Sequence, residues 1–304
     1  MYDILTIGGG PAGLTAAIYG ARAGLSVAVV EKAVPGGQIT STHQLENYPG
    51  FAQGISGAEF SQQLLEQAKR VGAQVLTDEI LSLQLEGKVK KAEGKAGSYQ
   101  AKTMILALGA APRKLEIPGE QQFTGMGVSY CATCDGAFFK GLRVAVIGGG
   151  DTAFEDALYL SDLAAEVYLV HRRDTFRAQQ YLVEKAKAKE NIHFIKQAVP
   201  VEICGGMDLE YIVLQDVQTG KRQELAVEGV FAAIGQKPNT ELVQGKIALD
   251  AAGYIEADEN TRTNIPGIFA AGDVRKKRLR QVVTAAADGA VAAMEAYHTI
   301  LEED

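Results

Sequence analysis

Two of the three cysteines lie three residues apart, in the segment Cys131-Ala132-Thr133-Cys134. This C-x-x-C spacing places two sulfurs within disulfide reach, and one thiol of such a pair commonly has a lowered pKa. Zinc is the competing ligand, but a zinc site needs four ligands, usually a second C-x-x-C or a close histidine pair. Cys204 and the four histidines are scattered singly. We therefore predict a redox-active disulfide here and no metal site.

Asp135 follows the cysteine pair directly. Reduction of a disulfide leaves a thiolate that must be protonated, and a neighbouring carboxyl group can supply the proton. The alternative is that Asp135-Gly136 merely forms a turn; we favour the proton donor. Phe138 and Phe139 come next, and consecutive side chains on a strand point to opposite faces. One of them is therefore expected in the core, and whether the other is an exposed docking surface stays open.

The thiols lie just before the second copy of an internal repeat. Residues 2–32 match residues 142–172, an offset of 140 residues. In each copy an apolar run leads into a glycine turn, a helix-forming stretch and a second apolar run. The expected strands are 4–7, 26–30, 144–147 and 166–170, and the expected helices are roughly 11–23 and 152–162. The turns are G-x-G-x-x-G at Gly8, Gly10 and Gly13, and G-x-G-x-x-A at Gly148, Gly150 and Ala153.

A β-turn-α-β unit with this turn is typical of dinucleotide binding. The first glycine permits the bend, the second lets a pyrophosphate approach the backbone, and the third small residue lets helix and strand pack. The pyrophosphate is held at the helix N-terminus. Two copies predict an α/β fold with two Rossmann-like dinucleotide-binding domains, the alternative being two tight turns without ligands.

The two copies differ where the second strand ends. The first copy has Glu31 there, which can accept hydrogen bonds from a ribose 2′-hydroxyl. The second copy has His171, followed by three arginines that can bind a 2′-phosphate, Arg172, Arg173 and Arg177. The first site is therefore predicted to hold FAD or NAD, and the second NADPH, although Arg172-Arg173 could also be a solvated surface pair.

Composition excludes several classes of function. The 304 residues carry 30 Lys+Arg against 37 Asp+Glu, a net charge of -7, which argues against nucleic-acid binding. The uncharged stretch 4–21 is interrupted by glycines and a proline, so we expect no membrane span. The start Met1-Tyr2-Asp3 lacks the positive charge of a signal peptide. Three cysteines fit a reducing compartment, so we expect a cytoplasmic protein.

Six segments, in order and nearly end to end, give the chain a family resemblance. The segment Gly-Val-Ser-Tyr-Cys-Ala-Thr-Cys-Asp-Gly (127–136) resembles the active-site segment of the low-molecular-weight thioredoxin reductases, and His-Arg-Arg-Asp-Thr-Phe-Arg-Ala (171–178) resembles their NADPH signature. Four others resemble their FAD-binding segments: Pro-Gly-Gly-Gln (35–38), Asn-Tyr-Pro-Gly (47–50), Gly-Ile-Phe-Ala-Ala-Gly-Asp-Val (267–274) and Arg-Gln-Val-Val-Thr-Ala (280–285).

The resemblance implies that electrons pass from NADPH to FAD, to the disulfide and then to thioredoxin. It makes Cys134 the flavin-proximal thiol, Cys131 the thiol that attacks thioredoxin, and Asp135 the acid. It adds FAD contacts at Gly37, Gln38, Asn47, Gly272, Asp273, Arg280, Gln281 and Val282. Taken alone, the basic cluster 275–280 would be a solvated face. The resemblance also implies a homodimer.

The expected organisation is a split FAD domain, residues 1–113 and 243–304, with an NADPH domain that carries the thiols inserted at 114–242. Residues 88–95 are expected as a solvated hairpin edge or loop, and 284–297 as a closing helix.

Three alternatives to a thioredoxin reductase remain. One is a flavin dithiol reductase for another thioredoxin-like acceptor or a peroxidase system; relatives of the latter kind carry an extra N-terminal thioredoxin-like module, which we do not expect here because the first glycine motif begins at residue 8. Another is a non-catalytic redox or zinc sensor on a nucleotide-binding scaffold. An oxidoreductase without a disulfide, of the ferredoxin–NADP type, is disfavoured by Cys131 and Cys134.

Overall fold

The chain divides into two compact units in a computed structural model that describes residues 1–42, 45 and 47–303. The split unit consists of Met1–Ala111 and Lys237–Asp304, and the inserted unit is Pro112–Gln236. The sequence predicts boundaries after residues 113 and 242, whereas the structure has them after Ala111 and Gln236, so the second boundary lies six residues earlier than expected. Two short strands, β7 (Ala110–Pro112) and β16 (Gln236–Pro238), pair where the chain passes between the units.

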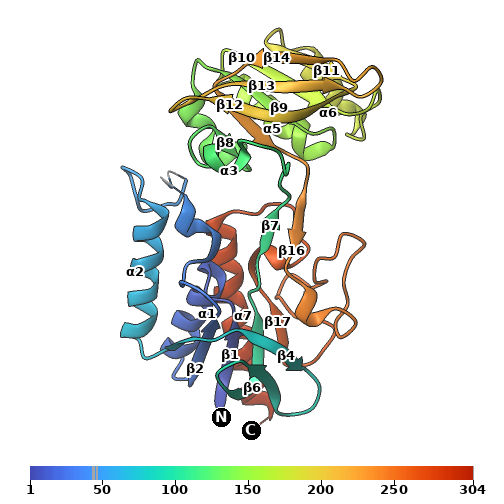
Figure 1. Cartoon of the computed structure of the whole chain (residues 1–304). Helices are drawn as coiled ribbons and strands as arrows, with labels where there is room; N and C mark the ends of the chain where they lie inside the picture. Colours follow the sequence, from blue (N-terminus) through green and yellow to red (C-terminus); the bar gives the residue numbers. More distant parts are fainter. Residues whose placement is uncertain (43–44, 46, 304) are drawn as a thin grey trace. The chain divides into compact units, whose positions relative to one another are not determined.

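The split unit is built on a seven-stranded sheet with the order β3-β2-β1-β6-β5-β4, and β17 pairs with β6 (Figure 1). Strands β1, β2, β3, β6 and β17 are parallel neighbours, whereas β4 and β5 join antiparallel. The strands are β1 (Tyr2–Ile7), β2 (Val27–Glu31), β3 (Gln74–Thr77), β4 (Ile80–Gln84), β5 (Lys90–Gly94), β6 (Ser98–Leu106) and β17 (Ile268–Ala270).

Helices cover one face of this sheet. They are α1 (Pro11–Arg22), α2 (Gly57–Arg70) and α7 (Val282–Glu303). The split unit also has three short 3₁₀ turns, η1 (Gly37–Ser41), η3 (Glu241–Val243) and η4 (Gly272–Val274), and Val243 and Val274 of the last two pack on the opposite face. Helices α1 and α7 lie side by side (Figure 1). Their backbones approach so closely that a Cβ at Gly289 would lie 2.1 Å from the carbonyl oxygen of Ala12. This close contact requires small residues, which explains the alanine-rich sequence of α7.

Strand β1 separates two hydrophobic cores because successive side chains point to opposite faces. Ile4 packs with the helices, whereas Leu5 and Ile7 pack on the other face with residues of β4, β5 and the segment after β16. The hairpin expected at 88–95 is present, because β5 pairs antiparallel with β4, but the expectation of a solvated edge is wrong. Strand β5 lies between β4 and β6, Ala92 is fully buried, and Lys90 donates from Nζ to two carbonyl oxygens, those of Gly87 and Pro266.

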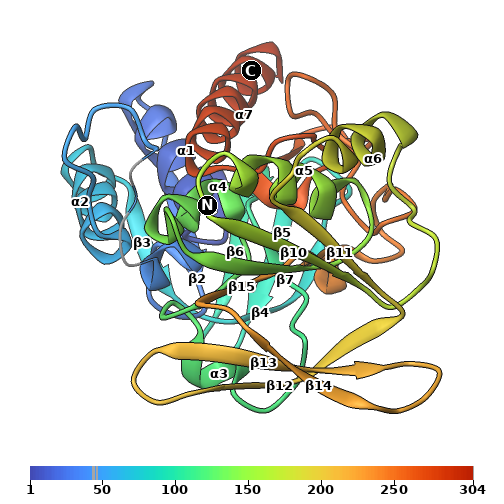
Figure 2. The same cartoon turned by 90° about the horizontal axis from the view of Figure 1, so that it is seen from above.

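The inserted unit has three layers (Figure 2). Its central parallel sheet has the order β11-β10-β9-β15-β8, and an antiparallel sheet β12-β13-β14 covers one face. Helices α5 and α6 cover the other face. The strands are β8 (Val128–Ser129), β9 (Arg143–Ile147), β10 (Glu166–His171), β11 (Ile192–Lys196), β12 (Ala198–Gly205), β13 (Leu209–Asp216), β14 (Arg222–Ala226) and β15 (Gly229–Ala232). The helices are α3 (Glu120–Phe123), α4 (Ala132–Asp135), η2 (Gly136–Phe139), α5 (Asp151–Ser161) and α6 (Gln180–Lys187).

The predicted repeat is present as β1-α1-β2 and β9-α5-β10, so the α/β class with two Rossmann-like units is confirmed. Phe138 and Phe139 lie on a 3₁₀ turn and not on a strand, which corrects the expectation. The ring of Phe139 nevertheless packs edge-on against Phe231, and Phe138 is exposed. Among the described residues, no helix is both long and apolar enough to cross a membrane.

Candidate functional site

The two cysteines of the C-x-x-C motif form a disulfide in the inserted unit, with their Cα atoms 5.3 Å apart. Cys131 precedes the single turn α4, and the carbonyl oxygen of Cys131 accepts hydrogen bonds from the backbone N–H groups of Cys134 (3.2 Å) and Asp135 (3.1 Å). This turn brings the second sulfur back to the first and places the carboxyl group of Asp135 one residue beyond. The sulfur pair predicted from the spacing is therefore present.

Asp135 is partly buried and has a close partner that the sequence did not indicate. The hydroxyl of Ser129 donates to Oδ2 of Asp135 at 2.6 Å, and its Oγ accepts the N–H of Cys131 at 3.1 Å. Burial raises the pKa of Asp135, and the hydrogen bond from Ser129 acts against this rise. A carboxyl group with a raised pKa keeps its proton closer to neutral pH, as a proton donor requires.

The glycine turn of the split unit has two positions that the protein itself requires. A Cβ at Gly8, whose φ is +105°, would lie 2.3 Å from the carbonyl oxygen of Ala107. A Cβ at Gly13 would lie 1.9 Å from the carbonyl oxygen of Gly8. The middle position of the motif differs, because a Cβ at Gly10 would meet only one atom within 4 Å, at 3.9 Å.

The turn of the inserted unit shows the same contrast. A Cβ at Gly148 would lie 2.5 Å from the carbonyl oxygen of Ala233, whereas a Cβ at Gly150 would meet nothing within 4 Å. In both copies the second glycine of the motif is therefore not required by packing. Its absent side chain leaves room beside the first turn of a helix, where an anionic group can bind.

Glu31 and His171 occupy equivalent places beneath the two turns. The carboxylate of Glu31 accepts the N–H of Gly9 at 2.6 Å, and a Cβ at Gly149 would lie 2.2 Å from Nδ1 of His171. His171 is buried, and its Nε2 lies 3.2 Å from the carbonyl oxygen of Thr175. Burial lowers the pKa of His171, so its ring is neutral at neutral pH. Because Glu31 and His171 occupy equivalent places, the alignment of the two copies from the sequence agrees with the structure.

The three arginines predicted to bind a 2′-phosphate lie on one exposed loop after β10. Arg172 and Arg173 follow His171 directly, and the backbone N–H of Arg177 donates to the carbonyl oxygen of Gly149 at 2.8 Å. The loop is therefore tied to the glycine turn, while all three guanidinium side chains stay exposed to solvent.

Asp273 and Arg280 carry polar atoms that lack partners in the split unit. Oδ1 of Asp273 and Nε of Arg280 are buried and have no hydrogen-bond partner among the described residues. Burial raises the pKa of Asp273, whereas Lys277 and Arg280 lower it. The Arg280 guanidinium lies 4.0 Å from the ring centre of Tyr254. Buried polar groups are normally satisfied, so these two atoms are candidates for ligand contacts.

The basic cluster 275–280 is not simply a solvated face, which corrects the expectation from sequence. The side chains of Arg275 and Lys277 are each 11% exposed, and both form ion pairs with Asp288 of α7, at 3.1 and 2.9 Å. Asp288 also accepts the N–H of Gly272 at 3.0 Å. The segment that carries Asp273 is therefore held against α7.

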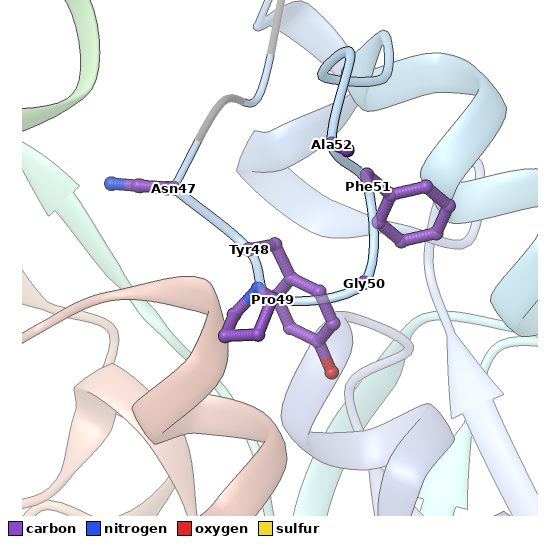
Figure 3. A pocket seen from close by; sticks show the side chains of 6 residues that line it. All are labelled: Asn47, Tyr48, Pro49, Gly50, Phe51 and Ala52. Carbon is purple, nitrogen blue, oxygen red and sulfur yellow. The ribbon is translucent and has the colours of Figure 1, made fainter.

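Some of the other residues predicted to contact FAD lie next to one another in the split unit. Nδ2 of Asn47 donates to Oε1 of Gln281 at 3.1 Å, just before α7 begins at Val282. Gln38 donates to the carbonyl oxygen of Ala110, and a Cβ at Gly37 would lie 3.3 Å from Cα of Gly10. Asn47 lines a surface hollow with residues 48–52, and its amide points away from the rings of Tyr48 and Phe51 (Figure 3). The adjoining residues 43, 44 and 46 lie outside the described part.

The chain is similar to known proteins over nearly its whole length. The chain matches the family described as pyridine nucleotide-disulphide oxidoreductase over residues 2–289. The thioredoxin reductase of Peptoclostridium acidaminophilum is 47% identical over 97% of this chain and 96% of that protein. The bifunctional thioredoxin reductase/thioredoxin of Mycobacterium leprae is 44% identical over 99% of this chain and 66% of that protein.

A solved structure agrees with these relatives. The crystal structure of thioredoxin reductase from Streptococcus pyogenes has 44% identity and a TM-score of 0.94, and the match covers 99% of each chain. The chain therefore belongs to the pyridine nucleotide-disulphide oxidoreductase family.

Proposed function

We propose that this chain is a thioredoxin-disulfide reductase in which electrons pass from NADPH through FAD to the Cys131–Cys134 disulfide and then to thioredoxin or a thioredoxin-like protein. The observation that carries the proposal is the disulfide, which lies in the same unit as the second glycine turn and the exposed loop that carries Arg172, Arg173 and Arg177. The relatives named above are thioredoxin reductases, and the M. leprae protein combines reductase and thioredoxin in one name.

The residues of each unit fit the cofactor proposed for it. FAD would lie in the split unit, with its pyrophosphate at Gly10 and the start of α1, its ribose at Glu31, and polar contacts at the unsatisfied atoms of Asp273 and Arg280. Gly37, Gln38, Asn47, Gly272, Gln281 and Val282 complete the proposed FAD contacts.

NADPH would lie in the inserted unit. Its pyrophosphate would bind at Gly150 and the start of α5, and its 2′-phosphate would bind the guanidinium groups of Arg172, Arg173 and Arg177. Gly148, Ala153 and His171 shape the turn beneath the nucleotide.

The residues around the disulfide define a thiol exchange. When bound, the two cofactors supply the two electrons that open the Cys131–Cys134 bond to one thiol and one thiolate. Asp135 supplies the proton, and the hydrogen bond from Ser129 orients its carboxyl group. The Cys131 thiolate then attacks a sulfur of the thioredoxin disulfide, which forms a mixed disulfide and releases one thioredoxin thiolate. Attack by Cys134 on Cys131 Sγ restores the internal disulfide and releases the second thioredoxin sulfur, which takes up a proton.

Absorbance and turnover test this proposal together. The purified chain should bind FAD, and anaerobic NADPH should bleach the flavin at far lower concentration than NADH. Thioredoxin with insulin as the final acceptor should then give continuous turnover. Cys131→Ser should retain flavin reduction but lose transfer to thioredoxin. A flavoprotein that NADPH reduces but that is inert toward thioredoxin favours another acceptor, whereas a chain that binds no flavin favours the sensor.

We also propose a homodimer in the cytoplasm. The family resemblance supports the dimer, and the low cysteine count supports the reducing compartment.

A further inference from the structure

The helix that would hold the NADPH pyrophosphate begins with an acidic residue. Asp151 is the first residue of α5 and directly follows Gly150. A carboxylate in the first turn stabilises the helix itself, because it faces the positive end of the helix dipole. It also opposes the binding of an anion at the same place, because the two negative charges repel each other. An acid here therefore needs a reason other than the pyrophosphate.

Both oxygens of Asp151 are engaged by a single residue at the far end of the arginine loop. We define this loop as residues 172–179. The backbone N–H of Gln179 donates to Oδ1 of Asp151 at 2.8 Å, and Nε2 of Gln179 donates to Oδ2 at 2.8 Å. These two bonds hold the pKa of Asp151 below its ordinary value, so the carboxylate stays charged at neutral pH.

The rest of the loop is fixed at separate points. The N–H of Arg177 bonds to the carbonyl oxygen of Gly149 at 2.8 Å, and the ring of Phe176 packs edge-on against buried Phe154 at 4.9 Å. Gln179 is the last residue before α6, so its bonds to Asp151 fix the end of the loop. The packing of Leu182 and Val183 also holds the start of α6, and the bonds to Asp151 add a direct link between this end of the loop and the start of α5.

We propose that Asp151 is a positioning residue that sets the preference for NADPH over NADH. Its bonds to Gln179 hold the arginine loop in the shape that receives the 2′-phosphate, while its charge disfavours the pyrophosphate of either dinucleotide. The repulsion weakens the binding of both nucleotides, but the ordered loop strengthens the binding only of the nucleotide that carries a 2′-phosphate. This inference rests on the proposed function, because it assumes that the arginines bind the 2′-phosphate.

A residue that only stabilises the start of α5 makes a different prediction. Its loss would destabilise the unit and would weaken both nucleotides by the same factor. The proposed role instead requires opposite changes for the two nucleotides, and this difference in sign separates the two possibilities.

The experiment uses the FAD-loaded protein and two nucleotide fragments. Adenosine 2′,5′-bisphosphate carries the 2′-phosphate, and 5′-AMP lacks it, so isothermal titration of each measures binding without turnover. Asp151→Ala should weaken binding of the bisphosphate about tenfold, because the loss of the two hydrogen bonds that hold the loop outweighs the relief of the charge repulsion. The same variant should bind 5′-AMP several-fold more tightly than wild type. The KM values for NADPH and NADH should follow the two fragments.

Two further variants separate the hydrogen bonds from the charge. Asp151→Asn removes the charge but retains an acceptor for the Gln179 N–H and an amide that can pair with the Gln179 side chain, so both fragments should bind at least as tightly as in wild type. Gln179→Ala retains the charge but loses one bond, so it should weaken only the bisphosphate. Asp162→Ala, which removes a carboxylate from the other end of α5, should change neither.

The outcomes are distinct. If Asp151→Ala and Gln179→Ala retain the wild-type preference for the bisphosphate, or if Asp151→Ala weakens both fragments equally, the inference is overturned while the proposed function stands. If the wild-type protein itself shows no preference for the bisphosphate, the assignment of NADPH fails with it. Thermal melting of each variant reports its folding, and Gln179→Ala tests the loop without altering α5.

Discussion

The hydroxyl of Ser129 donates a 2.6 Å hydrogen bond to Oδ2 of Asp135. The Ser129 Oγ also accepts the backbone N–H of Cys131 at 3.1 Å, so one hydroxyl joins the first cysteine to the candidate proton donor. Since Oδ2 accepts this hydrogen bond, the proton that Asp135 delivers is directed to Oδ1. The same bond stabilises the ionised carboxylate and thereby limits the rise in pKa that burial causes.

Ser129→Ala should move the alkaline limb of the pH–turnover profile to higher pH. Without the donated hydrogen bond, burial alone acts on Asp135, its pKa rises further, and the carboxyl group stays protonated to higher pH. Turnover at neutral pH should fall, because the carboxyl group loses its orientation. The measurement is the turnover number from pH 6 to 10 with thioredoxin at saturation.

Ser129→Thr and Asp135→Asn serve as controls for this profile. The threonine keeps the hydroxyl and should retain the wild-type limb. The asparagine cannot donate a proton as an acid, so the limb should disappear and turnover should be slow, while reduction of the flavin by NADPH stays intact. A Ser129→Ala profile that superimposes on that of wild type would show that the serine does not influence the acid.

Asp156→Asn should stabilise the protein more at high pH than at low pH. Burial, with a smaller contribution from Glu155, raises the pKa of Asp156 from its ordinary value of 3.8 to about 7. The folded state therefore holds this proton more tightly than the unfolded state, and the free energy of unfolding falls as pH rises from about 4 through 7. Above pH 7 the ionised carboxylate destabilises the folded state to its full extent, so the variant should be more stable there by about 2 kcal/mol. This is less than the whole pKa shift corresponds to, because the side chain is partly exposed to solvent.

Urea unfolding at pH 5 and pH 8 measures this difference. The gain at pH 8 should exceed the gain at pH 5. Asp162→Asn, which changes an exposed carboxylate at the C-terminal cap of α5, is the control for the loss of a negative charge near this helix. An equal effect of Asp156→Asn at both pH values would mean that the carboxyl group titrates normally.

Asp288→Ala should destabilise the split unit and loosen its flavin. The substitution leaves Arg275 and Lys277, each 11% exposed, without their common counter-charge. Removing one partner of a largely buried ion pair costs about 3 kcal/mol. Glu256→Ala is the matched control, since it breaks the exposed pair with Lys276 and should cost less than about 1 kcal/mol. Urea unfolding and the ratio of flavin to protein absorbance test both variants, and equal losses would argue against a special role of Asp288.

The sequence predicts those parts of this molecule that depend on local patterns. The two β-turn-α-β units were recognisable because glycine spacing and apolar runs are read within about thirty residues. The cysteine pair was recognisable for the same reason. The alanine-rich segment 284–297 predicts a helix, but only the structure shows the close contact of Gly289 with Ala12 that requires small residues there.

The parts that the sequence does not predict depend on distant partners. Lys90 looked solvated within a charged segment, but β5 pairs on both sides and the ammonium group reaches the carbonyl oxygen of Pro266, 176 residues away. The sequence predicts solvent-exposed side chains for Arg275 and Lys277, but in the structure both form ion pairs with Asp288 of α7. Ser129 lies only six residues before Asp135, yet no residue pattern announces a hydroxyl that bonds both to an acid and to a cysteine N–H.

Replacing Arg172 and Arg173 together by alanine should weaken the use of NADPH roughly a hundredfold or more, because each lost hydrogen bond to a charged group contributes about 1.5–3 kcal/mol. The KM for NADH should stay nearly unchanged, since that nucleotide has no 2′-phosphate to lose. Both guanidinium groups are exposed, so the preference of wild type for NADPH should also shrink as salt is added.

Steady-state kinetics with both nucleotides measure the two KM values. Arg222→Ala, an exposed change on β14 of the same unit, is the control and should alter neither. An equal loss with NADPH and NADH would remove the 2′-phosphate assignment, because a change that acts through folding or through the pyrophosphate cannot distinguish the two nucleotides.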